Sequence, residues 1–455
     1  ILRLLFLPFL FLFIVSCSES NRYEYILKDN NFKSNFKLNK GQNFVDLEEG
    51  FTFYNAVNQN SQKTPVVLIH GFSVPSYIWE PTYKMLREKG FYVISPDLFG
   101  RGNSKNIDGH YTDELFANQV LQLLNHLEID KADFVGLSNG GRVISKIADI
   151  KPEIINDLIY VASSSFMNKT KALVTDVSEK EIREFIDNNF PTISKGQLLD
   201  FKYPEKFLGW DDKYEELLKY KGFARALIST TKNHYNMDII HSRINYNSIP
   251  VFTIWGDSDS VVVYDKFSKR LDSLLPNRKE YFILESGHLP HMENEIEFNK
   301  VLLSIVLFMG VSVFEEIIFR GYVLKNLLES FNPYVALFVS SLFFSLIHGA
   351  NPNVTLLGLS NIFLAGIFLG ASYVFTKNLW FPIALHFSWN FFQAMFGFKV
   401  SGLDSYSIIK FDIIENNYIN GGEFGFESSV LSLIIIIIFT IIIWKYFKST
   451  VKENI

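Results

Sequence analysis

A serine flanked by glycines follows directly after an apolar stretch of the chain. Residues 132–138 predict a buried strand, Gly136, Ser138 and Gly140 have the spacing G-x-S-x-G, and a helix is predicted from Asn139. A sharp turn from strand to helix needs small neighbours and leaves the serine hydroxyl exposed. The pattern therefore predicts a nucleophile; the alternative is a glycine-rich turn without chemistry.

A serine alcohol is a weak nucleophile and needs a base, which in turn needs an acid to orient it. The strand predicted over 250–256 is followed by Asp257 and Asp259, and the strand predicted over 279–285 is followed by His288. Loops at the carboxyl ends of parallel strands gather at one edge of a sheet. We therefore expect Asp259 to be the acid and His288 the base, with Asp257 as the alternative acid.

Two backbone N–H groups are expected to stabilise negative charge on the reacting carbonyl oxygen. Acyl transfer needs such donors where the oxyanion develops. One should belong to Asn139, and the other to Phe72, which follows the strand predicted over 66–70. His70 and His291 are expected to be buried, hydrogen-bonded histidines with a structural role.

The elements that must position these residues predict an α/β fold. Further strands are predicted at 92–98 and 158–164, and a helix at 113–127. Near-continuous apolar strands separated by helical stretches indicate a doubly wound, mostly parallel sheet with helices on both faces. Segment 166–248 would form a helical cap, whose many aromatic residues suit either an apolar substrate or the cap's own core.

Residues from about 45 to 309 resemble the α/β-hydrolase family, within a domain expected over 35–309. The motifs that carry the resemblance are His70-Gly71-Phe72, the run from Asp97 to Ser104 (DLFGRGNS), the G-x-S-x-G turn, Gly256-x-x-Asp259 and Gly287-His288. The resemblance implies a cofactor-free serine hydrolase of the esterase or lipase kind, acting on small apolar esters, lipids or related acyl compounds. Peptidases, haloperoxidases and carbon–carbon bond hydrolases share these motifs, so the exact substrate stays open.

Near residue 300 the chain becomes membrane-like, and apolar runs predict an all-α transmembrane helical bundle. The candidate spans are 301–323, 334–348, 355–376, 380–399 and 430–447, followed by a basic tail at 448–455. The last span contains LSLIIIIIFTIIIW and is the least ambiguous of the five.

Ionisable side chains within these spans indicate function, because they are costly in lipid. The polar residues concerned are Glu315, Glu316, Arg320, His348, His386 and Asn390. Glu316 and Arg320 lie four residues apart and can pair on one helix face, which leaves Glu315 facing elsewhere. The alternative without chemistry is a polar cluster that packs the helices together.

The motifs E-E-x-x-x-R, F-x-x-x-H and H-x-x-x-N occur in this order and resemble the CAAX-type intramembrane protease family. The resemblance implies that Glu315 and His348 activate a water, that His386 and Asn390 stabilise the oxyanion, and that the substrate is a peptide or protein in the membrane. Glutamate and histidine are residue types that bind zinc, so a zinc ion held by Glu315, His348 and His386 remains an open alternative. Family members have several helices before the first motif, so the domain at 310–447 is expected to be truncated at its beginning.

The N-terminal residues predict export and lipid anchoring. Residues 1–16 are apolar with Arg3 as the only charge, and the tetrapeptide Ile14-Val15-Ser16-Cys17 resembles a bacterial lipobox. We expect 1–20 to be a lipoprotein-type signal and tether, with Cys17 lipidated. The alternative is an uncleaved anchor helix. The hydrolase-like domain would then lie on the exported side of a bacterial cell membrane.

Composition limits the partners further. The 455 residues carry 43 Lys+Arg against 48 Asp+Glu, and this balance excludes charge-driven binding to nucleic acid. Cys17 is the only cysteine, which excludes an intrachain disulfide and a zinc–thiolate cluster. Five spans would place Lys445, Lys448 and Lys452 in the cytoplasm and the acidic loop 400–429 outside, as the positive-inside rule expects.

Overall fold

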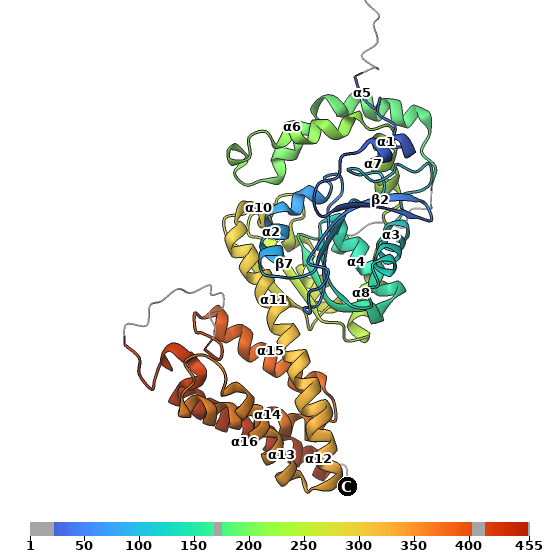
Figure 1. Ribbon diagram of the computed structural model, residues 1–455. Helices are drawn as coiled ribbons and strands as arrows, with labels where there is room; N and C mark the ends of the chain where they lie inside the picture. The colour runs from blue at the N-terminus through green and yellow to red at the C-terminus, as the bar shows by residue number, and fades with distance from the viewer. Residues whose placement is uncertain (1–21, 168–174, 403–414, 454–455) are drawn as a thin grey trace, which may run out of the picture. The chain divides into compact units, whose positions relative to one another are not determined.

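The computed structural model describes residues 22–167, 175–402 and 415–453 (Figure 1). The chain divides into two compact units between Glu295 and Ile296, earlier than the boundary expected at residue 309. We call these the N-terminal unit and the C-terminal unit, and each is described by itself. The expected lipidation site, Cys17, lies outside the described residues.

An eight-stranded sheet forms the centre of the N-terminal unit, in the spatial order β1-β2-β4-β3-β5-β6-β7-β8. The strands are β1 (Gln42–Leu47), β2 (Gly50–Val57), β3 (Val66–Ile69), β4 (Val93–Pro96), β5 (Ala132–Leu137), β6 (Ile155–Val161), β7 (Val251–Gly256) and β8 (Lys279–Ile283). β1 pairs with β2 and β2 with β4 in antiparallel fashion, and all other neighbours are parallel. The predicted mostly parallel sheet is confirmed.

Strands β1 and β2 form a hairpin that the sequence analysis did not predict. The pair closes on the register Leu47↔Gly50, so only Glu48 and Glu49 lie in the turn. β1 contains Gln42, Asn43 and Asp46 and lies at the edge of the sheet, so it lacks the continuous apolar character of the central strands. By contrast, every residue of β5, β6 and β7 is buried.

Helices cover both faces of the sheet. Figure 1 shows α2 (Glu80–Glu88) and α10 (Pro290–Glu293) on one side, and α3 (Asp113–His126), α4 (Asn139–Ile150) and α8 (Asp238–Tyr246) on the other. The remaining short helices of the sheet domain are α1 (Asn30–Asn35) and α9 (Ser268–Leu274). The side chain of Thr112 caps α3 by accepting from the N–H of Leu115, and Phe116, Val120 and Leu123 bury its apolar stripe.

The expected cap contains α5 (Glu179–Gly196), α6 (Trp210–Glu215) and α7 (Phe223–Lys232). α8, the last helix of the expected segment, instead packs on α4, where Arg243 pairs with Asp149 at 2.7 Å. The aromatic residues Phe190, Phe201, Trp210 and Tyr214 are buried, and the rings of Phe201 and Phe207 stack 3.9 Å apart. These residues therefore form the core of the cap, the second of the two interpretations.

The segment that follows the predicted signal is docked on the cap. Glu24 and Ile26 donate backbone hydrogen bonds of 2.8 Å to the carbonyls of Leu218 and Lys219. The Glu24 carboxylate also accepts from the N–H groups of Gly222 and Ala224, at 3.0 and 2.6 Å, and so caps the start of α7.

Most of the described residues of the C-terminal unit are helical. Its elements are α11 (Glu295–Glu316), the π-helical segment η9 (Ile317–Leu324), α12 (Lys325–Ser330), α13 (Pro333–His348), α14 (Leu356–Thr376), α15 (Trp380–Met395) and α16 (Val430–Glu453). α14 packs against α13, α15 and α16. A Cβ on Gly366 would lie 2.9 Å from the Cβ of Ser341, so small residues let α13 and α14 approach closely.

Two stretches of the described chain, Glu295–Ser330 and Leu356–Thr376, are long and apolar enough to cross a membrane by length and composition. Pro333–His348 and Val430–Tyr446 are shorter apolar helices. Each of the five predicted spans overlaps a helical element of this unit, and the first, 301–323, covers parts of both α11 and η9. The predicted helical bundle is confirmed, and its apolar helices indicate association with a membrane.

Candidate active sites

Three predicted site residues of the N-terminal unit lie at the carboxyl ends of parallel strands. Ser138 follows β5, Asp259 follows β7 and His288 follows β8. Phe72 follows β3, which lies next to β5 in the sheet. The four residues therefore open at the same edge of the sheet, where ligands of such sheets bind.

The backbone at Ser138 is strained. Its φ is +49°, a left-handed conformation that a non-glycine residue rarely adopts. A Cβ on Gly136 would lie 2.6 Å from the Gly140 carbonyl oxygen, and a Cβ on Gly140 would lie 2.4 Å from that of Ile69. Both glycines are therefore required by the close approach of the β5–α4 turn to its neighbours.

Asp259 and His288 form a buried pair. The His288 Nδ1–H donates to Asp259 Oδ2 at 2.9 Å, and the exposed fractions of the two side chains are 5% and 2%. The other Asp259 oxygen accepts from the N–H groups of Val261 and Val262, at 2.8 and 2.9 Å. With Nδ1 occupied in this way, Nε2 is the nitrogen left to accept a proton.

Asp257, the alternative acid, has different hydrogen-bond partners. Its Oδ1 accepts from the N–H of Ser286 at 3.2 Å and from the hydroxyl of Ser258 at 2.9 Å. Its side chain also lies 3.8 Å from the Lys202 ammonium. The geometry thus favours Asp259 as the partner of the histidine.

The charge state of His288 depends on surrounding carboxylates. Burial alone would lower its pKa, but the hydrogen bond to Asp259 and the negative charges of Asp259, Asp200 and Glu293 outweigh burial. The pKa of His288 is therefore raised above its ordinary value. A base whose protonated form is stabilised in this way accepts a proton more readily from a hydroxyl.

The loop that carries Phe72 lies against the serine turn. A Cβ on Gly71 would be 3.5 Å from the Cβ of Ser138. The N–H of Leu98 donates to His70 Nε2 at 2.9 Å, so Nδ1 carries the ring proton and donates to the Gly71 carbonyl, also at 2.9 Å. The planar trans peptide then directs the Phe72 N–H away from His70.

The two histidines expected to be structural are buried and hydrogen-bonded. Burial lowers the pKa of both His70 and His291 to about 3. His291 Nε2 lies 3.0 Å from the Ile78 carbonyl oxygen, and its ring lies 4.5 Å from that of Trp79.

His234, which was not among the predicted site residues, lies beside the expected oxyanion donors. Its Nε2 donates to the Asn139 side-chain oxygen at 2.8 Å, and its ring centre is 6.5 Å from that of Phe72. Arg142 pairs with buried Asp113 at 2.7 Å. It also donates at 2.8 Å to the carbonyl of Tyr235, the residue after His234. The histidine comes from the distant α7–α8 connection, so no local signal marked it.

The polar residues of the C-terminal unit come together from α11, η9, α13 and α15. Glu316 Oε1 accepts from Arg320 and from His386 Nδ1, both at 2.8 Å. Arg320 also donates to the Gly366 carbonyl of α14 at 3.2 Å, and its guanidinium lies 4.4 Å from the centre of the Phe344 ring. The expected Glu316–Arg320 pair is therefore present, and it also orients a histidine.

Glu315 faces both histidines of the cluster. Its Oε2 lies 3.9 Å from His348 Nε2 and 3.8 Å from His386 Nε2. His348 Nδ1 donates to the Phe344 carbonyl at 2.7 Å and His386 Nδ1 donates to Glu316, so both Nε2 atoms are acceptors when the rings are neutral. These distances are too long for direct hydrogen bonds. A water has only two protons to donate, so it can bridge Glu315 and one neutral histidine, and the other histidine can contact it only as a donor, in its protonated form.

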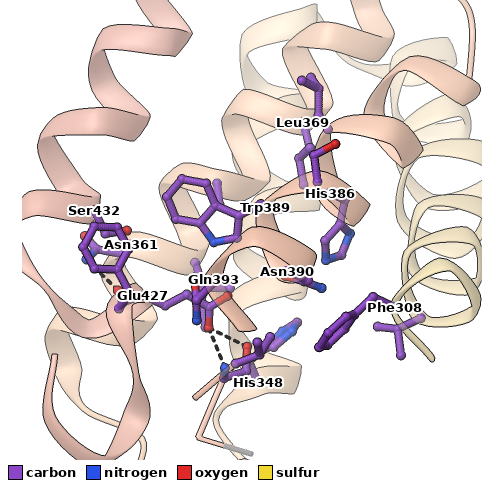
Figure 2. Close-up of a pocket in the computed structure, with 18 of the residues that line it drawn as sticks. Phe308, His348, Asn361, Leu369, His386, Trp389, Asn390, Gln393, Glu427 and Ser432 are labelled. Carbon is purple, nitrogen blue, oxygen red and sulfur yellow. Dashed lines mark hydrogen bonds between the residues drawn. The ribbon is translucent and has the colours of Figure 1, made fainter. Parts of the chain in front are cut away.

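This cluster lines an apolar cavity of about 740 Å³. Figure 2 shows His348, His386 and Asn390 at the cavity together with Glu427, which the sequence analysis did not identify. Glu427 Oε2 accepts from the N–H and hydroxyl of Ser401, at 2.8 and 2.7 Å. Glu427 precedes α16, far from the three motifs, so their spacing could not have shown it.

The arrangement does not support the zinc site considered on ligand type. No group of three or more His, Cys, Asp or Glu side chains among the described residues is arranged to hold a metal ion. His348 and His386 are oriented by a carbonyl and by a carboxylate through Nδ1, an orientation that metal-bound histidines share.

Comparison with known proteins identifies both units. The family model described as "alpha/beta hydrolase fold" matches residues 64–295, and "Type II CAAX prenyl endopeptidase Rce1-like" matches residues 297–392. The chain is 25% identical over 253 residues to the uncharacterized hydrolase YugF of Bacillus subtilis, covering 53% of this chain and 89% of that protein. It is also 25% identical over 244 residues to the pimeloyl-[acyl-carrier protein] methyl ester esterase of Aliivibrio fischeri, covering 51% and 90%.

Among solved structures, the enol-lactonase from Burkholderia xenovorans LB400 has a TM-score of 0.50 at 18% identity, covering 58% of this chain and 99% of that one. This similarity shows the fold alone. The matched hydrolase model spans just over half of the 455 residues. The chain therefore belongs to the α/β-hydrolase fold family, and its esterase-like hydrolase domain is fused to an Rce1-like domain.

Proposed function

We propose that this chain is a membrane-associated serine hydrolase that cleaves small esters through Ser138, Asp259 and His288. The observation that carries the proposal is the buried His288–Asp259 hydrogen bond of 2.9 Å, at the sheet edge where the strained Ser138 turn opens. His288 Nε2 removes the proton from Ser138 Oγ as the hydroxyl attacks the ester carbonyl. Asp259 holds the tautomer and stabilises the imidazolium that forms.

The backbone N–H groups of Phe72 and Asn139 stabilise the tetrahedral oxyanion in this proposal. Asn139 is the first residue of α4, so its N–H has no partner within the helix and lies at the positive end of the helix dipole. His288 then protonates the leaving alcohol, which leaves an acyl group on Ser138. A water deprotonated by His288 hydrolyses this acyl-enzyme and regenerates the serine.

Esters are the proposed substrate class because two relatives bear the names methyl ester esterase and bifunctional esterase/perhydrolase. The test is the hydrolysis of p-nitrophenyl butyrate and labelling by a fluorophosphonate, with the full-length chain in detergent micelles. Ser138→Ala should abolish both. Ser258→Ala is the matched control, because Ser258 is a neighbouring serine that contacts Asp257 rather than His288. Unchanged labelling in Ser138→Ala would overturn the proposal.

A second candidate function, peptide hydrolysis in the membrane, is favoured by the contacts of Glu315. In this proposal a water donates its two protons to Glu315 Oε2 and His348 Nε2, which activate it, and protonated His386 together with Asn390 stabilises the oxyanion. Glu316 and Arg320 would orient His386. The peptide or protein substrate would enter from the membrane through the apolar cavity.

This second function is tested with a farnesylated peptide ending in a CAAX sequence, incubated with the full-length chain in lipid vesicles. Glu315→Gln should abolish cleavage, while Glu329→Gln, on the exposed end of α12, should not. Cleavage that persists in Glu315→Gln would leave the C-terminal unit as an anchor only. Cleavage that disappears only in Ser138→Ala would assign the activity to the hydrolase domain.

We further propose that the chain is exported, anchored through lipidated Cys17, and multi-pass, with its hydrolase domain outside a bacterial cell membrane. The two helices that meet the length and apolarity of a span support membrane association. Metabolic labelling with palmitate should be lost in Cys17→Ser. Externally added protease should digest the hydrolase domain in intact spheroplasts, and protection of that domain would reverse the proposed topology.

A further inference from the structure

The cap of the N-terminal unit touches the loop that carries His288. The backbone N–H of His288 donates to the carbonyl of Asp200 at 2.8 Å. Asp200 lies at the end of the short helix that follows α5, and residues 200–203 continue the chain across the histidine loop. We call residues 200–203 the crossing segment. Through this hydrogen bond, the position of His288 depends directly on the cap.

A single carboxylate holds the crossing segment and the histidine loop together. Glu293 Oε1 accepts from the N–H groups of Lys202 and Tyr203, at 2.7 and 3.3 Å. Its Oε2 accepts from the N–H of Gly287 at 2.5 Å. Because each oxygen serves a different side, only a group with two acceptor atoms can bridge cap and loop in this way.

Gly287 gives an independent sign of the same close approach. A Cβ at this position would lie 2.8 Å from the Lys202 nitrogen and 2.9 Å from the Asp200 carbonyl oxygen, both of them backbone atoms. A side chain at residue 287 would therefore push the crossing segment away. The glycine beside His288 is explained by the passage of the cap over it, and not by an unusual φ.

We propose that Glu293 is a positioning residue that locks the cap to the histidine loop, so that the base reaches its working position only when the crossing segment is in place. This proposal rests on the proposed serine hydrolase function. Ester hydrolysis then requires the closed cap. Movement of the crossing segment away from the loop would break the His288–Asp200 backbone bond and shift the imidazole relative to Ser138.

The charges around His288 predict how the pH dependence of kcat/KM changes when Glu293 is substituted. Asp259, Asp200 and Glu293 face the ring with negative charge, and His291 lies in the same loop. Lys202, beside Glu293, is engaged by Glu285 at 3.1 Å. Removal of the Glu293 charge lowers the pKa of His288, so the acid limb of kcat/KM moves to lower pH.

The experiment compares Glu293→Gln with the full-length wild-type chain in micelles, using p-nitrophenyl butyrate. A glutamine has one acceptor oxygen, and its NH2 group would face an N–H. We expect kcat to fall roughly ten- to a hundredfold with little change in KM. We also expect the acid limb to move to lower pH. Rates are normalised to sites titrated with fluorophosphonate, so unfolded protein does not imitate a lower kcat.

Glu205→Gln is the matched control. Glu205 is an exposed carboxylate of the cap just beyond the crossing segment, so kcat and the acid limb should stay at wild-type values. If Glu293→Gln does not fold, Gly287→Ala carries the test, because its Cβ displaces the same crossing segment. We expect kcat to be lowered in Gly287→Ala too, so that raising the substrate concentration does not restore the wild-type rate.

Wild-type kcat and an unmoved acid limb in Glu293→Gln would overturn the proposal. Ser138→Ala in the same assay separates this failure from a failure of the proposed function. If Ser138→Ala is inactive while Glu293→Gln behaves as the wild type, the hydrolase function stands and only the role of Glu293 is wrong. If Ser138→Ala remains active, the serine mechanism itself is wrong.

Discussion

Nδ1 of His288 lies 2.9 Å from Oδ2 of Asp259, and both side chains are almost completely removed from solvent. In this environment the carboxylate fixes the imidazole in one tautomer, with Nε2 directed away from the acid. The other Asp259 oxygen is held by two backbone N–H groups of the same loop. The acid is thus oriented by its own backbone before any substrate binds.

Asp259→Asn is predicted to remove most of the esterase activity while preserving the fold. An amide can occupy the same space, but its NH2 group would face Nδ1 and favour the wrong tautomer. We expect kcat to fall by roughly 10³–10⁴-fold. Asp257→Asn, which changes a carboxylate bonded to Ser286 instead, should keep activity within a few-fold of the wild type. Equal losses in both variants would contradict this assignment of the acid.

The central strands and the serine turn were predictable because their signals are local. β5, β6 and β7 are buried along their whole length, so their apolar runs are continuous in sequence. Ser138 is flanked by glycines for steric reasons that act within a few residues. Asp259 and His288 could be proposed because each lies within five residues of the end of a strand.

Other features depend on contacts between distant segments and left no local pattern. The β1–β2 hairpin mixes polar and apolar residues at the sheet edge. Glu293 accepts hydrogen bonds from the backbone of Lys202 and Tyr203, which lie far from it in the sequence. His234 likewise contacts the distant Asn139. Glu427 reaches the cavity of the C-terminal unit from beyond the last motif. Such residues are polar in sequence and acquire a role only through the tertiary fold.

Gly140→Ala is predicted to destabilise the N-terminal unit by about 1–3 kcal/mol. The added Cβ would meet the Ile69 carbonyl oxygen at 2.4 Å and force the start of α4 away from β3. Urea unfolding followed by tryptophan fluorescence measures the loss, and fluorophosphonate labelling should slow as well. Gly196→Ala is the control, since nothing lies within 4 Å of its Cβ and its φ of −60° suits alanine. There we expect unchanged or slightly higher stability.

Asp157→Asn is predicted to raise the melting temperature at pH 8 and to change it little at pH 5. Asp133 and Asp157 are fully buried, and the amide of Asn156 donates to both, at 2.6 and 3.0 Å. Burial raises the pKa of Asp133 to about 7, and burial together with the charge of Asp133 raises the pKa of Asp157 well above its ordinary value. The folded state therefore keeps protons that the unfolded state releases between about pH 4 and pH 7, so stability falls as pH rises through that window.

Thermal melting of the full-length chain at the two pH values measures the effect of Asp157→Asn. The exposed Asp130→Asn serves as the control for a simple change of net charge and should give the same difference between pH 5 and pH 8 as the wild type. A melting temperature of Asp157→Asn that is below the wild type at pH 8 would show that the buried carboxylate stabilises the fold, contrary to this prediction.

Arg320→Met is predicted to destabilise the C-terminal unit by about 3–5 kcal/mol, because it leaves Glu316 buried without its cation. The guanidinium and the carboxylate are 1% and 0% exposed, and the carboxylate also holds His386. The double variant Arg320→Met, Glu316→Gln should recover part of this loss, since no uncompensated charge remains. Peptide cleavage should stay low in the double variant, because His386 has lost its orienting carboxylate. Unfolding in micelles of increasing denaturing detergent measures stability, and a double variant less stable than Arg320→Met would contradict the electrostatic explanation.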